Sequence, residues 1–255
     1  MVLERAKCIF GVGDERFTLN KKKMDPMIEV LESGPEISKV FDARIKTPAR
    51  ILFIGQSGTG KTHLLISLIL SDERVLDQEV QEVILFSMHY DPIYVNLEKK
   101  FGSRFKYERS LPSDSFAKYL TNGEGHKVVI IDDFQEKATR SEAVANLFSI
   151  FSRHRNTSSF LTLQNPFSQG QHKGTLFRNA TGLALFKPSL DQIAINILAG
   201  RLFPKNSKTF HDIYQASLRK SEPYGYLFID ANPSIESAKF RTNLLAPVQT
   251  VFIPR

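Results

Sequence analysis

Short apolar runs alternate with amphipathic stretches along most of the chain, from residue 48 onward. The runs are rich in β-branched and aromatic residues, which is typical of strands buried on both faces. The stretches between them place apolar residues at helical spacing, as Val144, Leu147 and Phe148 do within a helix predicted over 141–153. This alternation predicts an α/β fold with a mostly parallel central sheet and helices on both faces. The predicted strands cover residues 51–54, 83–86, 128–131, 160–163, 182–186 and 225–230.

The two ends of the chain depart from this pattern. Near the start we expect a small hairpin within residues 7–19 and one short helix over 27–31. We therefore divide the chain into an N-terminal extension or arm, residues 1–47, a core domain, residues 48–235, and a C-terminal tail, residues 236–255.

The most informative motif lies between the first predicted strand and an apolar helix over 64–70. It fits the phosphate-loop pattern G-x-x-x-x-G-K-[ST], and a strand before it and a helix after it are the context that this motif requires. Glycines let the backbone turn its N–H groups around a phosphate chain, and the helix N-terminus adds partial positive charge. We expect Lys61 to reach the β- and γ-phosphates of ATP, the Thr62 hydroxyl to bind Mg²⁺, and His63 to contact the nucleotide. The loop consists of Gly55, Gln56, Ser57, Gly58, Thr59, Gly60, Lys61 and Thr62.

Polar residues end two of the later strands, at the edge of the sheet where a bound nucleotide would lie. Asp132 is placed to hold Mg²⁺, and Asp133 to orient or activate the attacking water. Gln164 ends the next predicted strand and could contact the γ-phosphate or that water. Taken alone, the acidic pair could equally cap a helix, and Gln164 could simply open a turn.

Phosphoryl transfer also builds up charge that an arginine can stabilise, often from a neighbouring subunit. Arg153 and Arg155 precede the strand that ends in Gln164, and Arg178 precedes the next strand. Each is a candidate arginine finger or phosphate contact, and each could also be an ordinary surface arginine.

Composition adds a few limits. The formal net charge of +7 suits a polyanionic partner, although lysines scattered over solvated faces give the same value. Cys8 is the only cysteine, so no disulfide can form within the chain and a reducing, intracellular compartment is expected. The sequence shows no signal peptide and no apolar run long enough to span a bilayer, so we expect a soluble protein without a membrane partner.

Several segments together resemble the FtsK–HerA superfamily, and more narrowly the genome-packaging ATPases of poxviruses, Maverick/Polinton elements, adintoviruses and virophages. The resemblance covers roughly residues 48 to 235. It departs from the family pattern at Leu163, where threonine is usual, and at Arg153-His154, where two histidines are commoner. Besides the phosphate loop, the segments that carry it are Asp132-Asp133, Phe151-Ser152-Arg153-His154-Arg155-Asn156, Phe160-Leu161-Thr162-Leu163-Gln164-Asn165-Pro166-Phe167, Phe186-Lys187-Pro188-Ser189-Leu190-Asp191-Gln192 and Pro223-Tyr224-Gly225-Tyr226-Leu227-Phe228-Ile229-Asp230.

The resemblance implies a RecA/FtsK-like P-loop NTPase fold and a ring of identical subunits that hydrolyses ATP to pump double-stranded DNA into a capsid. A neighbouring subunit would supply an arginine to each site, and a capsid or portal protein would be a partner at the place of virion assembly. DNA would be contacted through its backbone charge rather than through its base sequence. The preference for ATP over GTP rests on the resemblance alone.

Three other functions share the phosphate loop. A helicase or a transposition ATPase would use the same site to separate or move strands. A nucleotide-gated switch would hydrolyse slowly, although the Asn-Lys-x-Asp run that reads guanine is missing from the sequence. A small-molecule kinase would need an acceptor pocket that no motif indicates.

Overall fold

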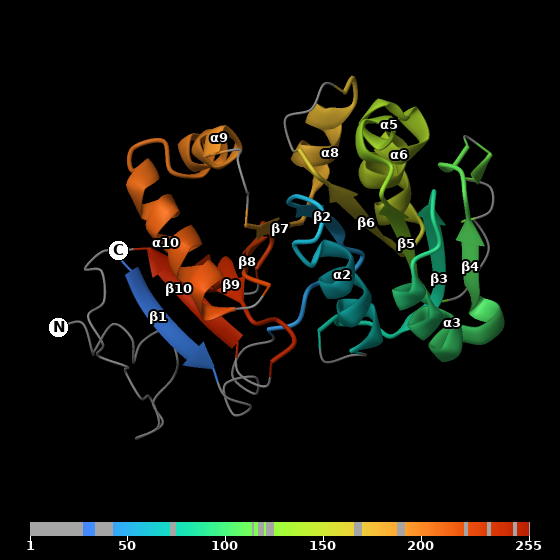
Figure 1. The fold of residues 1–255 in the computed structure, drawn as a ribbon, viewed down its shortest axis with the longest axis horizontal. Coiled ribbons are helices and arrows are strands. Elements are labelled where there is room, and N and C mark those ends of the chain that lie inside the picture. The colour runs from blue at the N-terminus through green and yellow to red at the C-terminus, as the bar shows by residue number, and fades with distance from the viewer. Residues whose placement is uncertain are drawn as a thin grey trace.

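The described residues form one sheet of ten strands with helices packed against it (Figure 1). The structure is a computed structural model and describes residues 28–33, 43–71, 75–113, 115–116, 120, 125–165, 170–187, 192–221, 224–233, 236–246 and 249–254. In order across the sheet, the strands are β1 (Ile28–Ser33), β10 (Gln249–Pro254), β9 (Phe240–Thr242), β8 (Tyr226–Asp230), β7 (Gly182–Phe186), β2 (Arg50–Ile54), β6 (Thr157–Leu163), β5 (His126–Asp132), β3 (Val80–Ser87) and β4 (Phe105–Glu108).

The strands from β7 to β4 all run parallel to one another, as the alternating pattern predicts. Every residue of β5 and of β6 is buried, which explains why such strands are continuous apolar or small-residue runs rather than alternating ones. β4 was not predicted because only every second residue of this edge strand is shielded from solvent, and its sequence Phe-Lys-Tyr-Glu lacks an apolar run. All six predicted strands are present, within β2, β3, β5, β6, β7 and β8.

Helices connect the parallel strands and cover both faces of the sheet, as predicted. The segment expected to be helical over 141–153 contains two short α-helices joined by a π-helical turn, η5 (Leu147–Phe151). Its start is capped by the Ser141 hydroxyl, which accepts a hydrogen bond from the backbone N–H of Val144. Among the helices that the structure describes, none has both the length and the apolar character of a membrane span. The α-helices are α2 (Lys61–Leu70), α3 (Val95–Phe101), α5 (Gln135–Arg140), α6 (Glu142–Asn146), α7 (Ser152–His154), α8 (Lys173–Asn179), α9 (Gln192–Leu202) and α10 (Ser207–Lys220).

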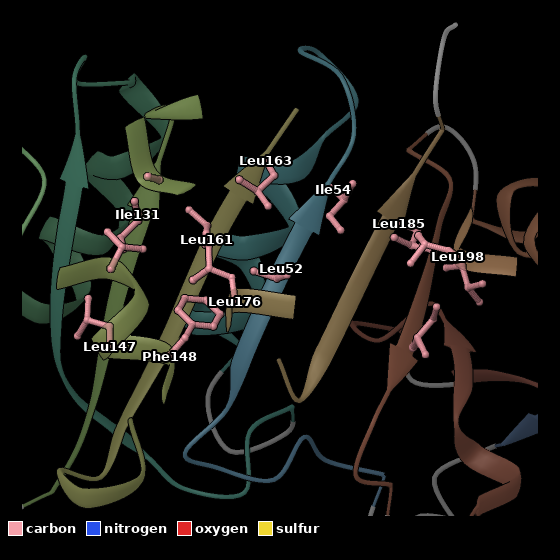
Figure 2. Close-up of a cluster of buried hydrophobic side chains, with 14 of the residues drawn as sticks. Leu52, Ile54, Ile131, Leu147, Phe148, Leu161, Leu163, Leu176, Leu185 and Leu198 are labelled. Atoms are coloured by element: carbon pink, nitrogen blue, oxygen red, sulfur yellow. The ribbon is translucent and has the colours of Figure 1, made fainter. Parts of the chain in front are cut away.

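Two hydrophobic clusters lie on opposite faces of the sheet. One packs side chains of α2 and α3 against β2, β3 and β5. The other is shown in Figure 2, where Leu52 and Leu161 of the sheet lie near Phe148 and Leu176 of the covering helices. Truncating one fully buried leucine of this kind to alanine costs roughly 2–5 kcal/mol. Because helices cover both faces of the sheet, a ligand can reach the sheet only at the ends of its strands.

The other strands of the sheet are antiparallel, and they include strands from both of the segments that the sequence set apart from the core domain. β8 pairs antiparallel with β7. The next strands, β9, β10 and β1, are each antiparallel to the strand before them in the sheet. The helix predicted over 27–31 is therefore wrong, because Ile28–Ser33 is a strand in register with Gln249–Pro254. A strand stabilised by a partner from the far end of the chain gives little local signal. The hairpin expected within residues 7–19 lies outside the described residues.

Candidate active site

The phosphate loop connects β2 to α2 at the carboxyl edge of the parallel strands, in the conformation that its glycines permit. Gly58 and Gly60 adopt φ values of +76° and +92°, a region that L side chains rarely occupy. A Cβ atom at Gly58 would meet nothing within 4 Å, so glycine is needed there for its backbone angle and not for space. Helix α2 begins directly after Gly60. Its first backbone N–H groups therefore lie at the loop, where an anion is favoured by both hydrogen bonding and the helix dipole.

Lys61 is held at the loop itself. Its side chain is only 9% exposed, and its Nζ donates a hydrogen bond to the Gln56 carbonyl oxygen over 2.6 Å. Burial lowers the pKa of Lys61 below its ordinary value, while the charges of Asp132 and Asp133 oppose that shift. A buried ammonium group beside open backbone N–H groups is suited to bind an anion with several charges.

The Asp132 carboxylate lies at the end of β5 and accepts hydrogen bonds from three hydroxyl groups. The Thr62 hydroxyl donates to Oδ2 over 2.9 Å, and the Tyr94 hydroxyl donates to the same oxygen over 2.7 Å. The Thr162 hydroxyl donates to Oδ1 over 2.6 Å. Burial, reinforced by the charge of Asp132, raises the pKa of Tyr94 above its ordinary range, so its phenol keeps the proton that it donates. The structure thus brings together Thr62 and Asp132, the two residues predicted to bind Mg²⁺, and oxygen ligands of this kind are those that Mg²⁺ prefers.

Asp133 and Gln164 line the same pocket with exposed side chains. Asp133 has a left-handed backbone, with φ of +58°, which is uncommon outside glycine but tolerated by aspartate. Its backbone N–H donates to the Thr162 hydroxyl over 3.2 Å, so one threonine connects both aspartates. Leu163, the departure from the family pattern, is buried in the core, whereas its neighbour Thr162 makes the hydrogen bonds at the site.

The predicted arginines lie at the amino ends of the parallel strands, opposite the ends that form the pocket. Arg153 is in α7 and Arg155 lies between α7 and β6, whereas Gln164 directly follows the other end of β6. Arg178 is in the last turn of α8, before the start of β7. A seven-residue strand such as β6 spans roughly 23 Å. Within the described part of one chain, Arg155 and Arg178 are not among the residues that line the pocket.

The pocket measures about 510 Å³ and includes residues that sequence patterns did not single out. Tyr94 lies in the short helix η3 (Pro92–Tyr94) after β3, and no motif marks it. Ser87 could have been noticed as the polar residue that ends β3. The loop after it contributes His89 and Tyr90 to the rim, and Tyr224 comes from the other side of the site, before β8.

Comparison with known proteins identifies the family. Residues 39–168, about half of the chain, match the family described as Poxvirus A32 protein. The chain belongs to this family. The matched stretch contains the phosphate loop, Asp132, Asp133 and Gln164, so the family assignment and the pocket concern the same residues. The predicted resemblance to poxvirus packaging ATPases is thereby confirmed at the level of the family.

Two curated relatives come from Variola virus. Both are named DNA packaging protein OPG160, one of them from the isolate Human/India/Ind3/1967. Each is 28% identical to this chain over 133 residues, which is 47% of this chain and 47% of the relative. The chain therefore spans about half the length of the curated relatives that it matches.

Solved structures show more distant likenesses. The genome packaging NTPase B204 from Sulfolobus turreted icosahedral virus 2, in complex with ATP-gammaS, is 13% identical, with a TM-score of 0.49 over 73% of this chain and 94% of that chain. The KaiC-like protein PH0186 from Pyrococcus horikoshii OT3 is 18% identical, with a TM-score of 0.33 over 53% of this chain and 71% of that chain. The assignment of a P-loop NTPase fold rests on this chain's own parallel sheet, phosphate loop and site.

Proposed function

We propose that this protein hydrolyses ATP with Mg²⁺ and uses the reaction to move double-stranded DNA into a capsid. One observation carries the proposal: the stretch that places the chain in the A32 family contains both the phosphate loop and the acidic end of β5, and the Thr62 hydroxyl of the loop contacts the carboxylate of Asp132. The curated relatives are named as DNA packaging proteins. The same site and family support ATP hydrolysis and DNA movement over the alternatives of a switch or a metabolite kinase.

The residues present fit a nucleotide with a metal ion. The loop backbone and Lys61 would bind the phosphate chain, and Thr62 and Asp132 would hold Mg²⁺. When bound, Mg²⁺ neutralises phosphate charge and polarises the oxygens around the reacting phosphorus. Tyr94 and Thr162, which donate hydrogen bonds to Asp132, would orient its carboxylate as outer partners of a metal ligand usually do.

Hydrolysis would be an in-line attack of water on the γ-phosphate. Asp133 would orient the water and accept its proton while the new P–O bond forms and the bond to the bridging oxygen breaks, releasing ADP and phosphate. Gln164, on the same rim, would contact the γ-phosphate or the water. Lys61 would stabilise the charge on the phosphoryl oxygens.

Coupling to DNA would require a ring. DNA would pass through its pore and meet basic side chains through backbone charge, which the net charge of +7 suits. An arginine of the neighbouring subunit, from among Arg153, Arg155 and Arg178, would complete each site. A capsid or portal protein would anchor the ring at the place of virion assembly.

The deciding experiment measures ATP hydrolysis by the purified protein with and without long double-stranded DNA, together with its oligomeric state. We expect a ring-sized assembly and strong stimulation by duplex DNA, which weakens as salt rises because phosphate contacts release counterions. Lys61→Ala should abolish turnover. Asp133→Asn should still bind ATP but lose roughly 100-fold or more in turnover, because the proton acceptor is gone.

Each alternative gives a different result. A monomer whose turnover ignores DNA would contradict the packaging function and favour a switch or a kinase. Separation of DNA strands, measured with a labelled duplex, would favour a helicase. Fast hydrolysis by Asp133→Asn would remove that residue from the mechanism while leaving the ATPase assignment intact.

A further inference from the structure

A tyrosine ring lies exposed directly against the phosphate loop. Tyr224 lines the pocket and is 52% exposed, which is unusual for a side chain of its size. It packs so closely on Gly60 that a Cβ atom built there would lie 2.9 Å from its ring atoms Cγ and Cδ1. The ring therefore touches the loop backbone on one side and leaves much of its surface to the solvent of the pocket.

The position of Tyr224 is set by rigid elements on its C-terminal side. A Cβ atom at the next residue, Gly225, would lie 2.5 Å from the backbone oxygen of Leu218 in α10, so the chain there is pressed against that helix. The backbone N–H of Tyr226 donates to the Ser221 hydroxyl over 3.0 Å as β8 begins. These contacts hold the tyrosine beside the loop without using the ring itself.

A second aromatic ring lies beside the first. His63, in the first turn of α2, stacks with Tyr224 at a centroid distance of 6.1 Å and an interplanar angle of 24°. Its side chain is exposed and also lines the pocket. Two nearly parallel aromatic rings therefore flank the phosphate loop and present apolar surface to the pocket.

The polarity of the site indicates what this surface binds. The residues for metal and water, Asp132, Asp133 and Gln164, mark the end of the pocket where a γ-phosphate belongs. In the sheet, β2 lies between β6 and β5, on the side of Asp132 and Gln164, and β7 and β8, on the side of Tyr224. The rings of His63 and Tyr224 are the aromatic surface on the loop itself, where the opposite end of the nucleotide would arrive.

We propose that Tyr224, supported by His63, is the platform on which the base of the bound nucleotide stacks. This inference rests on the proposed nucleotide-binding function and adds the residues that recognise the base. Stacking on an aromatic ring depends on the π-face that every base has, so it favours a nucleotide over a bare phosphate chain without reading which base is present. The phenol hydroxyl is not needed for stacking, so phenylalanine should serve as well as tyrosine.

The test compares the affinities of three Mg²⁺-loaded ligands, ATP, GTP and inorganic tripolyphosphate, by calorimetry. The proteins are the parent chain, Tyr224→Ala, Tyr224→Phe and a comparison variant on the other side of the pocket, Tyr90→Ala. Tyr90 is also an exposed tyrosine of the pocket, but its ring meets Tyr94, on the Asp132 side. Thermal unfolding of each variant reports any loss of fold, and we expect little change for Tyr224→Ala because the Tyr224 side chain is about half exposed.

We expect Tyr224→Ala to weaken ATP and GTP alike by roughly tenfold, since one stacking contact is lost, while tripolyphosphate binds as before. Tyr224→Phe should resemble the parent, and Tyr90→Ala should change the affinities for ATP and tripolyphosphate by the same factor, if it changes them at all. An equal loss for ATP and tripolyphosphate would overturn the platform, because it would mean that the ring acts only by shaping the loop at Gly60. A loss of ATP affinity in Tyr90→Ala but not in Tyr224→Ala would overturn it too, because the base would then lie on the other side of the pocket.

The parent protein separates this inference from the proposed function. If it binds ATP no more tightly than tripolyphosphate, the stacking platform is wrong but nucleotide binding stands. If it binds neither ligand, the nucleotide-binding function is wrong as well.

Discussion

Asp132 is held by hydroxyl groups from elements that are far apart in the sequence. Thr62 comes from α2, Thr162 from β6 and Tyr94 from the short helix after β3. The Tyr94 side chain is 2% exposed and its hydroxyl donates to the Asp132 carboxylate, so we expect its role to be positioning that carboxylate. Hydrogen bonds to charged groups contribute about 1.5–3 kcal/mol, which makes this contact strong enough to matter for metal binding.

Tyr94→Phe should therefore weaken Mg²⁺ binding while leaving the fold intact. We expect the Mg²⁺ concentration for half-maximal ATP hydrolysis to rise roughly tenfold, as is usual when the outer partner of a metal ligand is removed. Tyr107→Phe is the matched control, because its hydroxyl donates to the Ser87 carbonyl oxygen over 3.0 Å and does not touch Asp132. Equal Mg²⁺ requirements in both variants would show that Tyr94 does not position the carboxylate.

At the scale of elements, the antiparallel part of the sheet is joined by a buried ion pair. Arg241 of β9 is 2% exposed and donates from Nη2 to Oδ2 of Asp230, at the end of β8, over 2.5 Å. It also donates to the carbonyl oxygen of Ala43, on the segment leading into β2, and to Oε1 of Gln249 in β10 over 3.4 Å. One guanidinium group thus connects three strands with the chain that enters the phosphate-loop strand.

Removing one partner of this pair should destabilise the protein far more than removing a surface pair. Arg241→Met leaves the carboxylate of Asp230 buried without its cation, so the free energy of unfolding should fall by about 3–5 kcal/mol in urea titrations. The control is Lys239→Met, which breaks the pair with the exposed Glu236 at 3.2 Å and should cost less than about 1 kcal/mol. The double variant Asp230→Asn with Arg241→Met should recover part of the loss. Similar stabilities for the two single variants would contradict this role of the ion pair.

At the scale of the whole molecule, the pocket and the candidate arginines lie at opposite edges of the parallel strands. The phosphate loop, Asp132 and Gln164 follow the strands, whereas Arg155 and Arg178 come before them. A side chain cannot cross that distance within one subunit. A head-to-tail ring, however, places one edge of a subunit against a different surface of the next, which is how a neighbour could complete the site.

Mixing two inactive variants tests whether the site is shared. Arg178→Ala keeps an intact pocket and Lys61→Ala keeps an intact arginine, so in a 1:1 mixture about a quarter of head-to-tail interfaces would join the two intact halves. We expect hydrolysis to recover in the mixture but in neither variant alone. Arg140→Ala is the control, because this exposed arginine pairs with Glu136 and should leave activity unchanged. Activity that stays absent at every mixing ratio would argue against Arg178 as the shared residue.

Local signals were sufficient for the parallel core and for most of the site. Continuous apolar strands such as 128–131 are recognisable because burial on both faces leaves no polar alternation. The phosphate loop is recognisable because the tight turn of its backbone requires glycines at set positions within eight residues, Gly55 to Thr62. Asp132 and Gln164 could be predicted to meet because parallel strands end at one edge of a sheet.

The rest depends on contacts between distant parts of the chain. Ile28–Ser33 was predicted as a helix, and it is a strand because β10 supplies its hydrogen-bonding partners. The burial of Tyr94 against Asp132 and the position of Tyr224 on Gly60 follow from packing between elements and not from any local pattern. The sequence alone thus determined the phosphate loop, the acidic strand end and the positions of the buried strands along the chain, because backbone geometry and periodicity specify these features locally. Only the tertiary structure decided which side chains surround Asp132, which ring lies on the loop and where the arginines lie, because those outcomes depend on which elements pack against one another.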